Sequence, residues 1–169
     1  AQLHGYVKSD RWDRKRPKFM LVDVGGGTVD ACILNVMETA EGELRYSFLK
    51  SSVQKRGVVM LHLARLRWIE ESLQHSPSCS SDILGDLEKT SFALDNTQPL
   101  PNSVSDYISD ADCPDVPQNS DRLFYNRYGR VLWDEVIVPV KTKIDPSSEQ
   151  WKSLPLILCG GGSQHPIYR

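Results

Sequence analysis

The sequence predicts an α/β fold that carries a loop-rich acidic insertion. Short apolar runs bounded by glycines and polar turns are typical of buried strands, and two longer stretches carry apolar residues at helical spacing. The chain has 169 residues, which suits one domain or one domain with a large insertion. Hydrophobic residues make up 40% and charged residues 25%, a globular mixture that excludes wholesale disorder, collagen-like chains and membrane proteins.

Three consecutive strands are expected at about 18–24, 29–37 and 44–51. The triple glycine Gly25–Gly27 separates the first two strands, and a polar turn at Glu41–Glu43 separates the second from the third. Because both turns are short, the three strands are predicted to form an antiparallel meander. Another apolar run, Leu154–Cys159, ends at a second triple glycine, Gly160–Gly162, and predicts one more buried strand.

Two helices are predicted at about 58–74 and 122–144 and are expected to pack on the sheet. In the first helix, Arg65 is expected on the charged side. His62 is expected to be a packed or half-exposed helical residue, since no partner is spaced to make it a ligand. Pro139 is expected to kink the second helix.

The stretch between the two helices differs in composition from the rest of the chain. From Ser76 to Asp121 it holds eight Asp and one Glu against one Lys, a local net charge of −8, and half of the ten prolines. Pro and Asp at this density favour turns and loops over core elements. We therefore expect an inserted variable subdomain at 76–121, a core at 18–75 and 122–169, and a helix tail with a linker at 1–17.

Charge and cysteine spacing exclude several classes of protein. The formal net charge of −2 argues against a general nucleic-acid-coating protein. The four cysteines form no C-x-x-C pair, which excludes zinc ribbons and thioredoxin-type redox sites. Cys32 and Cys159 lie in apolar runs, as free thiols do in a reducing compartment, and the N-terminus lacks the apolar core of a signal peptide. These features predict a cytoplasmic location.

The two triple glycines, each directly after a buried strand, are the main functional signal. Successive bare N–H groups in such a turn can form a concavity suited to phosphate oxygens. The structural alternative is a tight turn that needs positive φ angles. The P-loop pattern fails because neither loop has an adjacent Lys. The dinucleotide pattern also fails, because Asp30 stands where its third glycine belongs and Val29–Val36 is typical of a strand, not a helix.

Polar residues around the first glycine loop indicate the ligand. Asp23 stands just before the loop, and Thr28 and Asp30 stand just after it. A carboxylate meets a phosphate through a magnesium ion and its waters, and a threonine hydroxyl can donate a hydrogen bond to a phosphate oxygen. The combination predicts a loop that binds the phosphates of a magnesium nucleotide.

Two segments resemble motifs of a known family. Phe19–Asp30, with the sequence FMLVDVGGGTVD, resembles the second phosphate motif of the actin, heat-shock chaperone and sugar-kinase ATPase superfamily (ASKHA). Leu156–Pro166, with the sequence LILCGGGSQHP, resembles the adenosine motif of that superfamily. The resemblance is closer to the chaperone-like and bacterial actin-like branches than to the sugar kinases. It implies a ribonuclease-H-like mixed sheet flanked by helices, in which strand 154–159 runs parallel to the first strand of the meander.

The resemblance also implies roles for individual residues. Asp23 would be the catalytic residue and would hold magnesium through water, and Asp30 would help to place the cation. Thr28 would touch the terminal phosphate. The residues implied to present amides to the β- and γ-phosphates are Gly25, Gly26 and Gly27. The residues implied to lie against ribose and adenine are Gly160, Gly161, Gly162, Ser163 and Gln164. The inserted subdomain would supply the far wall of the adenine pocket.

The chain departs from the family pattern in three ways. Gln164 stands where chaperones usually place an Arg that stacks on the base. The helix after Gly57 lacks the acidic residues that chaperones show there. The first phosphate motif, and the helix–strand–helix that the family shows after the position of Pro166, are not in this sequence. The resemblance therefore covers most of one lobe.

The function expected is that of an ATP-binding lobe of a chaperone-like or actin-like ATPase, with ATP and magnesium as cofactors and the other lobe of the parent protein as partner. The chain alone is expected to be inactive, because phosphoryl transfer needs groups from several sides.

Two other hypotheses stay open. One is a non-enzymatic interaction module that keeps the fold and uses 76–121 as a partner surface, and the other is a lobe of a sugar or acid kinase. Neither a nucleic-acid partner nor a membrane span is expected.

Overall fold

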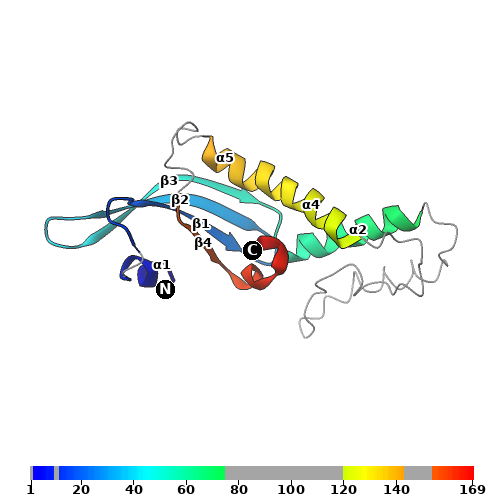
Figure 1. Cartoon of the computed structure of the whole chain (residues 1–169), viewed down its shortest axis with the longest axis horizontal. Helices are drawn as coiled ribbons and strands as arrows, with labels where there is room; N and C mark the ends of the chain where they lie inside the picture. The colour runs from blue at the N-terminus through cyan, green and yellow to red at the C-terminus, as the bar shows by residue number, and fades with distance from the viewer. Residues whose placement is uncertain (1, 10–11, 75–119, 143–153) are drawn as a thin grey trace.

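The computed structural model describes residues 2–9, 12–74, 120–142 and 154–169, and nearly all of the predicted insertion at 76–121 lies outside these ranges. The described elements form a mixed sheet with a long helical segment along one face (Figure 1). In chain order the helices and strands are α1 (Gln2–Val7), β1 (Lys18–Val24), β2 (Val29–Glu38), β3 (Leu44–Gln54), α2 (Val58–Leu73), α4 (Ser120–Leu132), the π-helical turn η2 (Trp133–Ile137), α5 (Val138–Lys141), β4 (Leu156–Cys159) and the 3₁₀ turns η3 (Gly161–Gln164) and η4 (Pro166–Tyr168).

The sheet has four strands in the order β3-β2-β1-β4. β1 pairs antiparallel with β2, and β2 pairs antiparallel with β3, so the predicted meander is confirmed. β4 pairs parallel with β1, from Met20 opposite Leu156 to Asp23 opposite Cys159. The predicted fold class, a three-strand meander plus one parallel strand with flanking helices, is therefore confirmed. β3 is three residues longer than expected: it stays paired with β2 as far as Gln54, with a bulge opposite Ile33 and Leu34.

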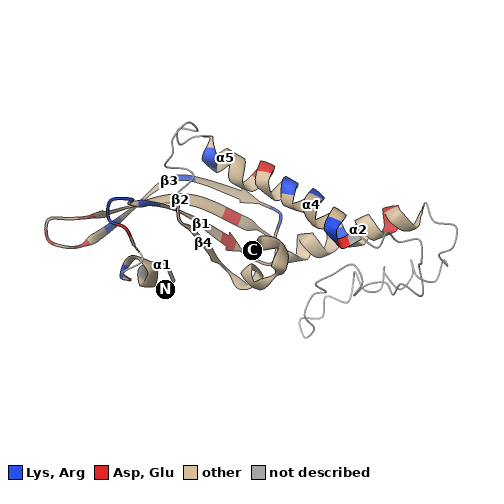
Figure 2. Ribbon diagram, in the orientation of Figure 1, with Lys and Arg blue, Asp and Glu red and all other residues tan. Residues whose placement is uncertain are grey.

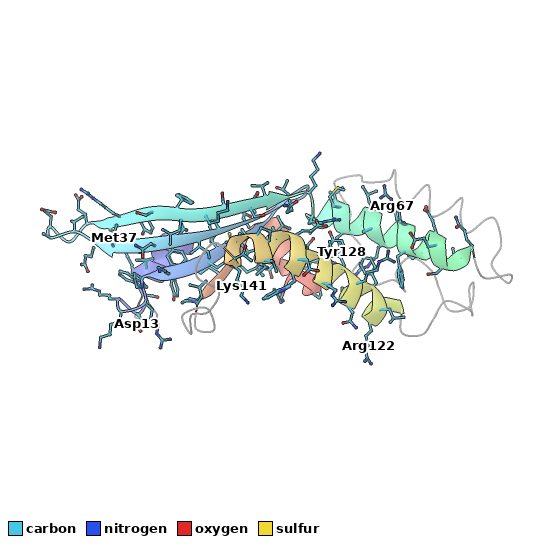
Figure 3. All side chains as sticks on the ribbon, turned by 90° about the horizontal axis from the view of Figure 1, so that it is seen from above. Asp13, Met37, Arg67, Arg122, Tyr128 and Lys141 are labelled. Atoms are coloured by element: carbon cyan, nitrogen blue, oxygen red, sulfur yellow. The ribbon has the colours of Figure 1, made fainter. Side chains whose placement is uncertain are left out.

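The two faces of the sheet are packed differently. One face carries the main core, in which buried residues of β1 and β2 meet Val136 and Val140 from the helical segment. Seen from above, the segment from α4 to α5, with Tyr128 and Lys141 on it, runs along this face (Figure 3). The other face has a smaller cluster of four buried residues, Val7, Phe19, Leu34 and Val36. No helix in the described ranges is long and apolar enough to cross a membrane.

The second long helix changes its hydrogen bonding just before Pro139, where a kink was expected. The turn η2 is π-helical, and the Val138 amide closes it on the Trp133 carbonyl. Pro139 has no N–H to donate to the carbonyl of Glu135, four residues earlier. That carbonyl accepts a hydrogen bond from Ser52 Oγ on β3, at 3.4 Å. A π-helical turn and a contact from the sheet thus accommodate the proline within one continuous helical segment.

Arg65 lies on the buried side of α2, so its expected place on the charged side was wrong. Its side chain is fully buried. The guanidinium lies 5.3 Å from the ring centres of both Phe124 and Tyr125, and Nη2 donates to the Tyr125 hydroxyl at 2.9 Å. Because α4 packs its aromatic side chains on this part of α2, an arginine finds cation–π partners there. His62 on the same helix is buried, which confirms the first of the two alternatives expected for it, a packed helical residue.

Candidate functional site

The first glycine loop is the hairpin turn between β1 and β2. The Gly25 amide donates to the Thr28 carbonyl at 2.9 Å, which closes the turn. Thr28 Oγ1 donates to Asp30 Oδ2 at 3.2 Å. Gly26 and Gly27 are exposed, and none of the three glycines has a positive φ. The structural alternative of a turn that requires positive φ angles is therefore wrong for this loop.

Two acidic residues stand opposite each other on neighbouring strands at the base of the loop. Asp23 on β1 and Asp30 on β2 are cross-strand partners, so their side chains share one face of the sheet. Figure 2 shows these two acidic positions side by side on neighbouring strands. Asp23 is exposed and Asp30 is half-buried. Like charges directly opposite each other repel, and a bound cation would offset that repulsion. Within the described ranges, no His, Cys, Asp or Glu side chains form a larger cluster that could hold a metal.

The second glycine loop lies against the first one. Gly160 has a φ of +86°, and a Cβ there would clash with Asp23 Oδ1 and the Val24 carbonyl. A Cβ at Gly162 would lie 2.6 Å from Val24 Cγ1 and 2.7 Å from Val58 Cγ1. The two loops therefore meet at the same end of the sheet, as the sequence predicted, and their contact depends on the absence of side chains.

The residues predicted to contact adenosine are not equally accessible. Gly160, Gly161 and Gln164 are exposed, whereas Gly162 and Ser163 are buried. The side-chain carbonyl of Gln164 accepts a hydrogen bond from the Arg169 guanidinium. An arginine thus stands beside the position where the family pattern places one. Gly162 and Ser163 pack the loop onto the protein, and their contact with a ligand stays a prediction.

The start of α2 also belongs to the site, which sequence analysis did not predict. Its first amides donate to the loop: Gly57 N to Gly27 O at 3.2 Å, Val58 N to Gly25 O at 3.1 Å, and Val59 N to Gly26 O at 2.8 Å. A helix leaves its first amides without partners of its own, and here the loop carbonyls satisfy three of them. The signal in the sequence was Gly57 itself, a glycine directly before a helix. A Cβ there would lie 2.5 Å from two loop carbonyl oxygens.

Two thiols lie near the carboxylates but are held in the neutral form. Burial, and then the charge of Asp23, raise the pKa of the Cys159 thiol. Burial, and then Cys159, raise the pKa of the Cys32 thiol. A thiol binds a metal or attacks as a nucleophile in its thiolate form. The groups offered to a ligand at neutral pH are therefore carboxylate oxygens, a hydroxyl and backbone amides, which suit a hard cation such as Mg²⁺ and phosphate.

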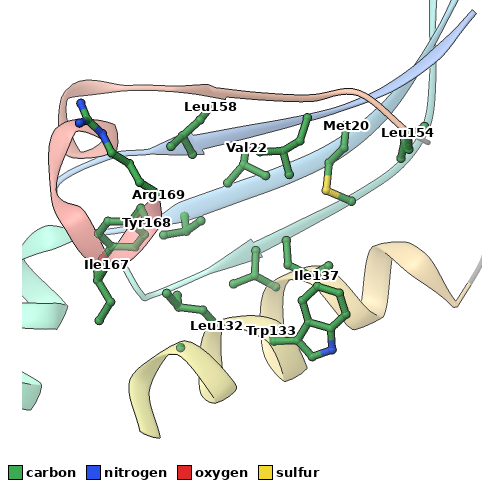
Figure 4. A pocket seen from close by; sticks show the side chains of 14 residues that line it. Met20, Val22, Leu132, Trp133, Ile137, Leu154, Leu158, Ile167, Tyr168 and Arg169 are labelled. Carbon is green, nitrogen blue, oxygen red and sulfur yellow. The ribbon is translucent and has the colours of Figure 1, made fainter. Parts of the chain in front are cut away.

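An apolar cavity of about 440 Å³ lies apart from these groups, between β4, the helical segment and the C-terminal turn. Figure 4 shows Met20, Leu158 and Tyr168 on one side of it and Leu132, Trp133 and Ile137 on the other. Among the described residues, its lining includes no Asp or Glu side chain and none of the predicted nucleotide residues. The polar groups at the loops, not this cavity, form the candidate site.

Of three comparisons with known proteins, only the search of solved structures gave matches. A scan against protein-family models and a search of curated proteins gave no match. The structure is similar to the ethanolamine utilization protein EutJ from Carboxydothermus hydrogenoformans, with a TM-score of 0.40 and 12% identity over 90% of this chain and 39% of that chain. It is also similar to a non-polymerisable quadruple mutant of pCBH ParM, with a TM-score of 0.43 and 12% identity over 88% of this chain and 37% of that chain.

The strand arrangement that the resemblance implied, a three-strand meander with a parallel fourth strand, is present in the structure. The chain spans less than two-fifths of the length of either of these structures. At 12% identity and with TM-scores below 0.5, the two matches carry no statement about ligand or activity.

Proposed function

We propose that the chain is a nucleotide-binding lobe of an actin-like or chaperone-like ATPase, which holds the phosphates of a magnesium nucleotide on Gly25–Thr28 and the nucleoside near Gly160–Gln164. The observation that carries the proposal is the orientation of the first loop. A trans peptide places the N–H of each residue opposite to the carbonyl of the residue before it. Since the carbonyls of Gly25, Gly26 and Gly27 bind the start of α2, the amides of the next residue in each case point away from α2.

Three successive amides facing away from α2 make a concavity for anions, and phosphate oxygens fit it. The glycines leave room for close approach, because a Cβ at Gly26 or Gly27 would meet none of the described residues within 4 Å. The space beside the loop is therefore open to a ligand.

The carboxylates of these neighbouring strands would suit a magnesium ion that accompanies the phosphates. Asp23 and Asp30 supply two oxygen groups on one face of the sheet, and Thr28 Oγ1 is tied to one of them. Mg²⁺ prefers one or two carboxylates together with phosphate oxygens and water. The ion would neutralise phosphate charge, while Asp23 would orient its water shell as the residue nearest to the reaction. The described residues surround the phosphates from one side only, so the complete ATPase needs groups from a second lobe.

The direct test is a titration of the ¹⁵N-labelled 169-residue chain with ATP and magnesium, followed by NMR. We expect weak binding, roughly millimolar, because half of the enclosing surface is missing, and the largest shifts at the amides of Gly26, Gly27 and Thr28. EDTA should reduce the shifts, and adenosine should act mainly near Gly161 and Gln164. Equal shifts with and without magnesium in both wild type and Asp23→Asn, or shifts confined to the apolar cavity, would contradict the proposal.

The same chain should not hydrolyse ATP on its own. One lobe alone leaves the terminal phosphate of ATP exposed to water. A protein hydrogen bond to an exposed phosphate replaces one to water and therefore gains little free energy. Phosphate release from MgATP by the purified chain is therefore expected to match that of a no-protein blank. Activity that disappears in Asp23→Asn would show that the site is complete within these 169 residues.

A further inference from the structure

The junction between β3 and α2 is bound by three other parts of the molecule. The Arg56 carbonyl accepts hydrogen bonds from the hydroxyls of Tyr168 at 2.7 Å and Tyr128 at 3.2 Å. The Arg56 guanidinium makes two hydrogen bonds of 2.8 Å to the Glu135 carboxylate. Tyr128 belongs to α4, Glu135 to the π-helical turn, and Tyr168 to the turn that follows the second glycine loop. We call these four residues the Arg56 junction.

One peptide unit connects the Arg56 junction to the phosphate loop. The carbonyl of Arg56 and the N–H of Gly57 belong to the same planar peptide and point in opposite directions. At one end, the tyrosine hydroxyls hold the carbonyl. At the other end, the Gly57 amide donates to the Gly27 carbonyl. A rotation of this peptide would disturb the contacts at both ends together.

Close packing makes the loop sensitive to this peptide. A Cβ on Gly57 would lie 2.5 Å from the carbonyl oxygens of both Gly25 and Gly26, so the helix start and the loop are in direct backbone contact. The two following amides, those of Val58 and Val59, hold these same carbonyls. The direction of the loop amides therefore depends on where α2 begins.

We propose that Tyr168 and Tyr128 are positioning residues for phosphate binding: by fixing the Arg56–Gly57 peptide, they hold the loop carbonyls on α2 and aim the amides of Gly26, Gly27 and Thr28 at the ligand. The proposal rests on the proposed function of the loop. Because Tyr168 follows the second glycine loop by a few residues, it also joins the two parts of the site through the protein.

The test uses Tyr128→Phe, Tyr168→Phe and the double variant, which remove only the hydroxyls. Tyr46→Phe is the matched control, since the Tyr46 hydroxyl is buried and has no hydrogen-bond partner in the described part of the chain. Binding of MgATP, MgADP and adenosine is measured by NMR titration, and exchange of the Gly57 amide is measured on the same samples. We expect the double variant to bind MgATP and MgADP roughly tenfold more weakly, which corresponds to the loss of about one neutral hydrogen bond. Its affinity for adenosine should not change. The Gly57 amide should exchange faster than in wild type. Tyr46→Phe should match wild type in each measurement.

Three results would overturn the inference. Wild-type MgATP affinity in the double variant would show that the hydroxyls do not position the loop. An equal loss for adenosine and for MgATP would show a general loosening of the site, not an effect on phosphate. Unchanged Gly57 exchange together with weaker MgATP binding would show that the effect does not pass through the Arg56–Gly57 peptide. Failure of wild type to bind any phosphate-bearing nucleotide would instead remove the proposed function on which the inference rests.

Discussion

The two triple glycines look alike in the sequence but meet different constraints in the structure. In the second loop, Gly160 has a positive φ and lies against Asp23 and Val24, and Gly162 lies against Val24 and Val58. In the first loop, none of the three glycines has a positive φ, and a Cβ at Gly26 or Gly27 would have no neighbour within 4 Å in the part of the chain that the structure describes. Packing within the protein thus requires glycine at two positions of the second loop. It does not explain the glycines in the exposed part of the first loop.

The difference separates a structural role from a ligand role. A glycine interior to a fold costs conformational entropy and is expected where the backbone shape or close packing demands it. Where neither applies, as at Gly26 and Gly27, close approach of something outside the chain is the remaining physical reason. The comparison predicts that substitutions at Gly160 and Gly162 damage the fold, whereas substitutions at Gly26 and Gly27 damage binding.

The largest effect is expected for Gly160→Ala. The alanine would combine a strained left-handed conformation with a clash against the Val24 carbonyl, and we expect a loss of about 3 kcal/mol or more in the free energy of unfolding. Gly161→Ala is the control, because a Cβ there meets nothing within 4 Å and φ is ordinary. Thermal unfolding followed by circular dichroism checks both. If the Gly160→Ala variant were as stable as the Gly161→Ala variant, the structural role assigned to Gly160 would be wrong.

Asp23→Asn should have the next largest effect, on binding. The loss of a charge-assisted contact costs roughly 1.5–3 kcal/mol, which is about ten- to a hundredfold in affinity for the magnesium nucleotide. Stability should not fall, because Asp23 is exposed and its removal relieves repulsion with Asp30. Titration with MgATP and chemical denaturation measure the two quantities separately. The alternative is a carboxylate with a purely structural role, and equal affinity with lower stability would favour it.

A smaller effect on stability is expected for Gly27→Ala. The conformation is open to alanine, so the free energy of unfolding should stay within about 1 kcal/mol of wild type or rise slightly. Phosphate binding should nevertheless weaken, because the methyl group occupies space at the loop where the ligand approaches. The measurement is denaturant unfolding of Gly27→Ala beside MgATP titration. Unchanged affinity would mean that the ligand does not come close to Gly27.

The smallest effect concerns the tyrosine that follows the second loop. Burial raises the pKa of the Tyr168 hydroxyl, with Tyr128 nearby as a second cause. A raised pKa in the folded state means that the neutral hydroxyl stabilises the fold below the unfolded-state pKa of about 10, and that this contribution is lost as pH rises above it. Tyr168→Phe should be about 0.5–1.5 kcal/mol less stable than wild type at pH 7, and the gap should narrow above pH of about 10.

Urea unfolding at several pH values between about 7 and 11 measures this gap. Tyr46→Phe serves as the control and should follow wild type, as its hydroxyl makes no hydrogen bond within the described residues. A gap that stays constant across the whole range would show that burial does not keep the Tyr168 hydroxyl neutral.

Local sequence determined the elements of the fold and most of the candidate site. The apolar runs Phe19–Val24 and Leu154–Cys159 each end at glycines, and this contrast places strands and loops without long-range information. The run from Asp23 to Asp30 holds a carboxylate, three glycines, a hydroxyl and a second carboxylate within eight residues. Because these groups lie next to each other in the chain, their meeting in space was predictable from the strand and turn alone.

Only the tertiary structure decided which residues meet and which are buried. Only the strand register places Asp30 directly opposite Asp23, and only the approach of β4 to β1 makes Gly160 sterically necessary. Arg65 is buried because α4 brings aromatic rings to it from about sixty residues away in the chain, a contact that helical spacing cannot reveal. The Arg56–Gly57 peptide unit is hydrogen-bonded to Tyr168 at its carbonyl and to Gly27 at its N–H, so it joins parts of the chain more than a hundred residues apart. Local pattern encodes the backbone path, but such contacts arise only when distant segments pack together, since burial and hydrogen-bond partners are properties of the assembled fold.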